Sequence, residues 1–265
     1  MQNEKPFFRE AGTGPSVVCI HSNASSSSQW RALMGRLSGQ FHVLAPDSLN
    51  AGKSPLWRQN SPVTLNDDAD FLEPVFAVAA NPFFLVGHSY GAAVALVAAL
   101  ARPGLVRALA LYEPTLFSLL EEEAPGQEAA QGIRDAVANA AAAIDRYDNA
   151  EAACHFIDYW MNAGAWGSMP VDRQGPIAAS MVHVSAWAHA LFGDRTPLEA
   201  FRSLDIPVLY MVGGQSPASS RSVARLLTRT LPQVTRLEFP ALGHMGPVTH
   251  PEVVNDAIAA FFART

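Results

Sequence analysis

The stretch Phe83-Phe-Leu-Val-Gly-His-Ser-Tyr-Gly-Ala-Ala-Val-Ala-Leu-Val-Ala-Ala-Leu-Ala101 joins two kinds of sequence through one short turn. Phe83 to Val86 is apolar at every position, which is typical of a strand buried on both faces of a sheet. Ala92 to Ala101 consists of small and aliphatic helix formers. We therefore expect the chain to pass from strand to helix at Ser89, in a turn sharp enough to lift that side chain out of the sheet.

The turn itself, Gly87-His-Ser-Tyr-Gly91, fits the pattern G-x-S-x-G. Glycines two residues before and after the serine leave room for a crowded backbone. The helix start offers free N–H groups and a positive dipole end, which suit an alkoxide or an oxyanion. The pattern alone occurs often by chance in ordinary loops, but its place between strand and helix favours Ser89 as a nucleophile and the Tyr90 N–H as an oxyanion donor.

The rest of the chain alternates apolar runs with helix-forming segments, except in its middle. This alternation of predicted strands and helices predicts an α/β fold with a mostly parallel sheet. The middle has helical composition without strands, so we expect a core of residues 1–115 and 201–265 and a helical cap of residues 116–200. The apolar runs are residues 16–20, 41–45, 83–86, 108–112, 206–212 and 234–239.

His244 is the histidine best placed to act as the base for Ser89. Gly243-His244 follows the last predicted strand, at the sheet edge where the Ser89 turn also lies. His88 and His250 are more typical of structural roles. A second oxyanion donor should come from a loop after an early strand, and Ile20-His-Ser-Asn-Ala24 makes the backbone N–H of Asn23 the candidate.

Together these segments resemble the α/β-hydrolase superfamily over nearly the whole chain. The resemblance implies a mostly parallel central sheet flanked by helices, a helical cap inserted after the sixth strand, and a serine hydrolase with a catalytic triad. The segments that carry it are Glu10–Pro15, His21-Ser22, Ala45–Ser54, Gly87–Gly91, Gly243-His244 and His250-Pro251.

The chain departs from that family's commonest pattern at the acid of the triad. Residues 213–220, after the strand near Val212, contain no carboxylate, and Ser216 stands where an Asp is expected. Asp205 precedes the strand and should lie at the wrong edge. The family's other solution places the acid one strand earlier, where this chain has Glu113, so Glu113 is our candidate. A structural role for Glu113 at the cap hinge is the alternative.

Composition and charge limit the classes of binding partner that we expect for this chain. The 24 acidic and 18 basic residues give a net charge of −6, and no basic patch for nucleic acid is visible. No run approaches the ~20 apolar residues of a membrane span, and the polar start does not resemble a signal peptide. Cys19 and Cys154 are expected to be free thiols, which favours a cytoplasmic location. No metal site or cofactor is predicted, and the oligomeric state is left open.

The predicted pocket is apolar and aromatic, with Ser22, Trp160, Trp166, Trp187 and Met245 as its candidate residues. We expect a serine hydrolase that cleaves a small or medium, largely apolar carboxylic ester or lactone through an acyl-enzyme intermediate. One alternative is C–C bond hydrolysis or cofactor-free perhydrolysis on the same triad. Another is a non-catalytic ligand-binding or signalling protein, which the missing carboxylate after Val212 favours.

Overall fold

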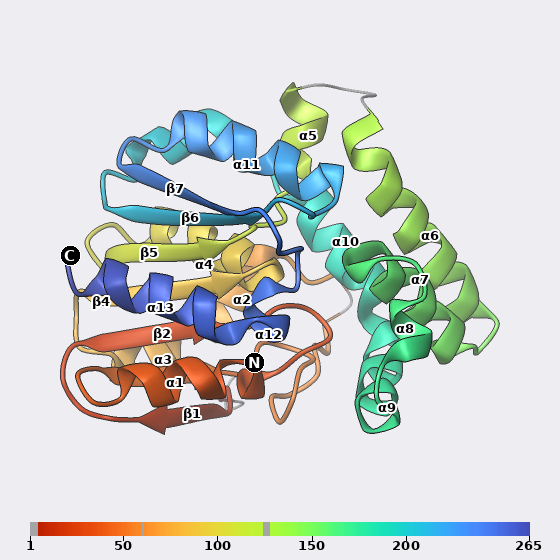
Figure 1. Ribbon diagram of the computed structural model, residues 1–265, viewed down its shortest axis with the longest axis horizontal. Coiled ribbons are helices and arrows are strands. Elements are labelled where there is room, and N and C mark those ends of the chain that lie inside the picture. Colours follow the sequence, from red (N-terminus) through yellow and green to blue (C-terminus); the bar gives the residue numbers. More distant parts are fainter. Residues whose placement is uncertain (1–4, 60, 124–127) are drawn as a thin grey trace.

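The computed structural model describes residues 5–59, 61–123 and 128–265, and its centre is one seven-stranded sheet with the order β1-β3-β2-β4-β5-β6-β7 (Figure 1). β1 is antiparallel to β3 and every other pairing is parallel. The mostly parallel sheet is therefore confirmed. The strands are β1 (Phe8–Ala11), β2 (Ser16–Ile20), β3 (His42–Pro46), β4 (Phe83–His88), β5 (Val106–Tyr112), β6 (Val208–Gly213) and β7 (Val234–Phe239).

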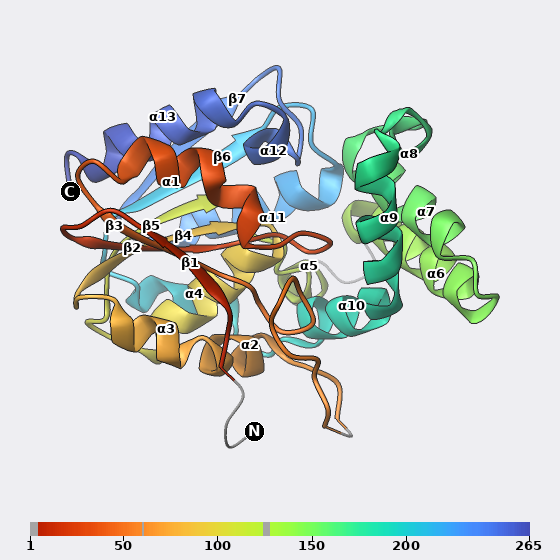
Figure 2. The ribbon, with the colours of Figure 1, turned by 90° about the horizontal axis from the view of Figure 1, so that it is seen from below.

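Helices cover both faces of the sheet, which is why β2 and β4 are buried throughout. One face carries α1 (Arg31–Leu37) and α13 (Pro251–Phe262), and the other carries α2 (Leu65–Phe71), α3 (Glu73–Val78) and α4 (Tyr90–Ala101), as Figure 2 shows. The buried side chains of α11 (Ala218–Thr230) belong to the same hydrophobic core as those of α4. Each face thus has its own hydrophobic core.

A helical insertion, which we define as Ser118–Gly193, lies beyond the carboxyl ends of the parallel strands (Figures 1 and 2). It separates β5 from β6. The expectation that it follows a sixth strand is wrong, because the described residues before it form five strands, with a single antiparallel strand ahead of β2. Its helices are α5 (Ser118–Glu123), α6 (Gln131–Asp145), α7 (Asn149–Met161), α8 (Ala165–Ser168), α9 (Val171–Ser180) and α10 (Val184–Gly193).

Two features were not predicted. β1 has only four residues, none of them fully buried, so it lacks the apolar signal of an interior strand. The short helix α12 (Gly246–Thr249) follows His244 and carries the chain into α13. Within the described residues, no helix combines the length and the apolar character needed to cross a membrane.

Candidate active site

Ser89 lies on the turn between β4 and α4, and its backbone has a conformation that residues other than glycine rarely adopt, with φ +56° and ψ −117°. Glycine is required at positions 87 and 91, because backbone atoms of neighbouring segments lie where a Cβ would be. A Cβ on Gly87 would lie 2.4 Å from the Cα of Ala92, and a Cβ on Gly91 would lie 2.4 Å from the carbonyl oxygen of Ile20. The turn is therefore packed tightly against the loop that follows β2.

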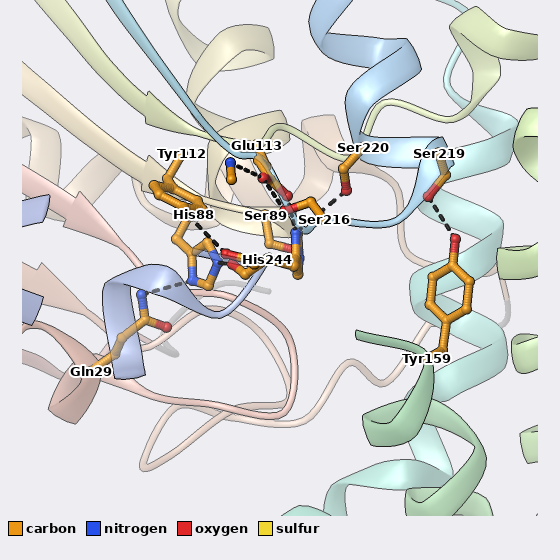
Figure 3. A network of polar contacts seen from close by, with 12 residues as sticks. Gln29, His88, Ser89, Tyr112, Glu113, Tyr159, Ser216, Ser219, Ser220 and His244 are labelled. Carbon is orange, nitrogen blue, oxygen red and sulfur yellow. Dashed lines mark hydrogen bonds and ion pairs between the residues drawn. The ribbon is translucent and has the colours of Figure 1, made fainter. Parts of the chain in front are cut away.

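His244 stands between Ser89 and Glu113, and both side chains point toward its ring (Figure 3). Its Nε2 lies 2.9 Å from Oγ of Ser89 and its Nδ1 lies 2.6 Å from Oε2 of Glu113. The exposed fractions are 6% for Ser89, 2% for His244 and 0% for Glu113. A carboxylate accepts and cannot donate, so Nδ1 carries the proton and Nε2 is free to accept from the serine hydroxyl.

The Glu113 carboxylate is held by three donors at the end of β5. Its Oε1 accepts the backbone N–H of Gly213 at 2.6 Å and the hydroxyl of Ser216 at 2.5 Å. Ser216, which stands where the sequence led us to expect an acid, thus binds the carboxylate of Glu113 at the end of the neighbouring strand. A buried charge is tolerated when its oxygens are hydrogen-bonded in this way. Asp205 instead accepts the Gln233 amide at an exposed site.

Hydrogen bonds fix the backbone of the His244 loop. The ring of His88 donates from Nε2 to the carbonyl oxygen of His244 at 2.9 Å, and Tyr112 donates its hydroxyl to the carbonyl of Gly243 at 2.8 Å. Burial, and next the neighbouring His244, hold the pKa of His88 well below 6.5, so this ring is neutral and donates from Nε2 alone. The structural role expected for His88 fits these contacts.

Gln29 connects that loop to the turn after β2 and was not identified from the sequence. Its amide nitrogen lies 3.2 Å from Nδ1 of His88 (Figure 3), and its amide oxygen accepts both the backbone N–H and the hydroxyl of Ser22. The ring of His21 bridges the same turn to Ser48. Nothing in the spacing of Gln29 could have revealed this, because its partners are 7 and 59 residues away.

A cavity of about 330 Å³, counted with its open mouth, adjoins Ser89. Of the predicted pocket residues, Trp160 and Trp187 line it, whereas Ser22, Trp166 and Met245 are not among the lining residues. The Ser22 hydroxyl is bound to Gln29, and Met245 precedes α12 in the His244 loop. The lining residues are Asn23, Ser89, Thr115, Phe117, Ile133, Val137, Phe156, Trp160, Val184, Trp187, Ala188, Leu191 and Phe192.

The two predicted oxyanion donors belong to different segments, and each has a link to Ser89. Tyr90 is the first residue of α4, directly after Ser89, and Asn23 lines the cavity together with Ser89.

A larger surface hollow between α1 and α13 is bridged by the Arg36–Asp256 ion pair, and neither Ser89 nor His244 lines it. Among the described residues, His, Cys, Asp and Glu side chains do not gather in the threes that a metal site needs.

Comparison with known proteins shows the family to which the chain is similar. A family model described as the alpha/beta hydrolase fold matches residues 15–251. The chain is 30% identical to the 2-(acetamidomethylene)succinate hydrolase of Mesorhizobium japonicum over 96% of this chain and 90% of the relative. It is 29% identical to the lipase LipV of Mycobacterium tuberculosis over 93% of each chain.

A solved structure also covers nearly the whole chain. The alpha/beta hydrolase from Sphaerobacter thermophilus superposes with a TM-score of 0.71 at 26% identity, over 97% of this chain and 96% of that one. Proteins named as hydrolases thus resemble this chain in overall sequence and in fold.

Proposed function

The chain belongs to the alpha/beta-hydrolase family, and on that premise we propose that it is a serine hydrolase cleaving small or medium, largely apolar carboxylic esters or lactones. The observation that carries the proposal is the hydrogen-bonded series Ser89–His244–Glu113, which ends at the wall of an apolar cavity. The order nucleophile, acid, histidine along the chain is that of this fold.

In the proposed reaction, Oγ of Ser89 attacks the ester carbonyl carbon while Nε2 of His244 takes the hydroxyl proton. Glu113 stabilises the resulting imidazolium through Nδ1–H. The backbone N–H groups of Tyr90 and Asn23 bind the negatively charged oxygen of the tetrahedral intermediate. The C–O bond then breaks, the leaving alkoxide takes the proton from His244, and an acyl-enzyme remains. Water attacks this ester in the same manner and regenerates Ser89.

The lining of the cavity favours a neutral substrate. Its thirteen residues include no Lys, Arg, Asp or Glu, and its polar members are Asn23, Ser89 and Thr115 beside the indole N–H groups. An anionic group placed there would lose water without gaining a charged partner, which costs several kcal/mol. The relative from Mesorhizobium japonicum acts on a succinate derivative. We propose that this chain does not share that preference for a dicarboxylate.

The position of Glu113 also bears on the non-catalytic alternative. That alternative depended on the absence of a carboxylate after the strand now seen as β6. A buried carboxylate 2.6 Å from Nδ1 of His244 supplies what was missing, and this supports the enzyme over the binding protein.

Covalent labelling tests the nucleophile. A fluorophosphonate should modify the parent protein at Ser89, and Ser89→Ala should abolish both labelling and ester hydrolysis while the protein stays folded. Ser220→Ala is the matched control, because that buried hydroxyl also lies near His244, 3.4 Å from Nδ1, yet it should leave labelling intact. Labelling of a folded Ser89→Ala protein would refute the assignment.

A pair of esters of equal chain length tests the pocket. We expect kcat/KM for p-nitrophenyl butyrate to exceed that for mono-p-nitrophenyl succinate by at least about tenfold, since the second ester must bury a carboxylate without a partner. Preference for the succinate ester would show that the cavity is not the acyl pocket.

A further inference from the structure

Trp160, from helix α7 of the insertion, lies flat against the ring of His244. The two ring centroids are 3.9 Å apart and the ring planes differ by 26°. Trp160 is 7% exposed, so the indole also covers the imidazole from water. This contact joins a residue of the insertion to the central member of the proposed triad.

The indole is held in place by other aromatic rings. Phe117 is stacked at 6.3 Å with an angle of 16°, and Phe156 and Tyr159 meet it edge-on at 6.2 and 4.9 Å. The hydroxyl of Tyr159 is within 2.7 Å of Oγ of Ser219 on α11, as Figure 3 shows. The residue next to Trp160 is thus tied to the core of the protein, which fixes the height of the indole above His244.

The groups that face His244 from the other elements determine how the charge of its ring is balanced. Among the described residues that contact the His244 ring, Glu113 supplies a negative charge, and Ser89 and Ser220 present hydroxyls; His88 beside it is kept neutral by burial. The ring of His244 gains a positive charge when it takes the serine proton. The face of an indole attracts a cation through its ring quadrupole, and more strongly than a phenyl ring does.

We propose that Trp160 is a positioning residue that stabilises the His244 imidazolium and holds the ring plane between Ser89 and Glu113. The inference rests on the proposed function, since the imidazolium forms only if His244 accepts the serine proton. The stabilisation exists in the transition state and not in the resting enzyme, so its loss should lower kcat. Both acylation and deacylation pass through the imidazolium, so the loss should not depend on the acyl group.

The test compares Trp160→Phe, Trp160→Leu and Trp187→Leu on p-nitrophenyl acetate and butyrate. Trp187 lines the same cavity but contacts Phe156 and His183 rather than His244. We expect Trp160→Leu to lower kcat about 3- to 30-fold on both esters, the range of a cation–π contact, and Trp160→Phe to lose less. Trp187→Leu should act mainly on KM, and more for butyrate than for acetate.

A spectroscopic measurement tests the stack without catalysis. In protein labelled with [2-¹³C]histidine, the Cε1–H resonance of His244, identified by its loss in His244→Gln, should be shifted upfield by the indole. Trp160→Leu should remove this shift and Trp187→Leu should keep it. An unshifted resonance in the parent protein would overturn the inference even if the Trp160 variants fail to fold.

The two proposals fail in different ways. If Ser89 is not labelled and the parent hydrolyses no ester, the proposed function fails. If the parent hydrolyses both esters and folded Trp160→Leu keeps the parent kcat, or changes only KM, then the role of Trp160 is wrong and the triad stands.

Discussion

Replacing Glu113 by Gln tests the point at which this chain departs from the commonest pattern of its family. The carboxylate accepts three hydrogen bonds, two at Oε1 from Gly213 and Ser216 and one at Oε2 from His244. A glutamine amide has one oxygen and one NH₂ group. Turning the NH₂ toward Gly213 and Ser216 would leave a buried donor facing donors, at a cost of about 1–3 kcal/mol. The amide oxygen should therefore occupy the Oε1 position.

That orientation points the amide NH₂ at Nδ1 of His244. Nδ1 must then accept, which moves the ring proton to Nε2, where it faces Ser89 and cannot take the serine proton. The negative charge that stabilises the imidazolium is lost as well. In a serine protease the corresponding change costs about 10⁴ in kcat, which equals about 5.5 kcal/mol of barrier. We expect a loss of about 10³- to 10⁴-fold here, with KM little changed.

The assay is steady-state hydrolysis of p-nitrophenyl butyrate at pH 7.5, with thermal unfolding as the check on folding. Ser216→Ala is the matched control: it removes one of the two donors to Oε1, keeps the charge, and should lower kcat less than tenfold. If folded Glu113→Gln works within tenfold of the parent, Glu113 is structural and the triad as drawn is wrong.

Three further predictions concern the surroundings of the site. Burial raises the pKa of Asp68, which accepts the Tyr90 hydroxyl, from 3.8 to about 6; native protein then holds a proton that unfolded protein has lost, so stability falls as pH rises through this window. The free energy of unfolding of the parent, measured in urea, should fall by up to about 3 kcal/mol more between pH 4 and pH 7.5 than that of Asp68→Asn. An equal pH dependence in the two proteins would contradict this. Gln29→Met should cost about 1–3 kcal/mol in unfolding free energy, because it leaves the N–H and hydroxyl of Ser22 and Nδ1 of His88 without their partner, and an unchanged Tm would refute it. Gly91→Ala should yield little folded protein, because its Cβ would meet the Ile20 carbonyl at 2.4 Å; normal expression and activity would count against the tight turn.

Much of the fold was predictable because its signals are local. Interior strands such as β2 and β4 are buried at every position and are therefore largely apolar, and the turn at Ser89 needs glycines at fixed offsets. The four-residue edge strand β1 is partly exposed and carries no such signal. The place of the insertion after the fifth strand depends on how many strands pair ahead of it, which is a property of the whole sheet.

For the site too, local sequence signals were predictive and contacts between distant segments were not. Ser89 and His244 could be proposed as candidates from the sequence because each follows a recognisable strand at the same sheet edge, and Glu113 because it directly follows β5. The sequence by itself could not choose between Glu113 as the acid and Glu113 as a hinge residue. That choice depends on three distances across 100, 103 and 131 residues of chain. The same holds for Trp160 above His244 and for Gln29 behind His88: contacts between distant segments arise from packing in three dimensions, and no spacing along the chain encodes them.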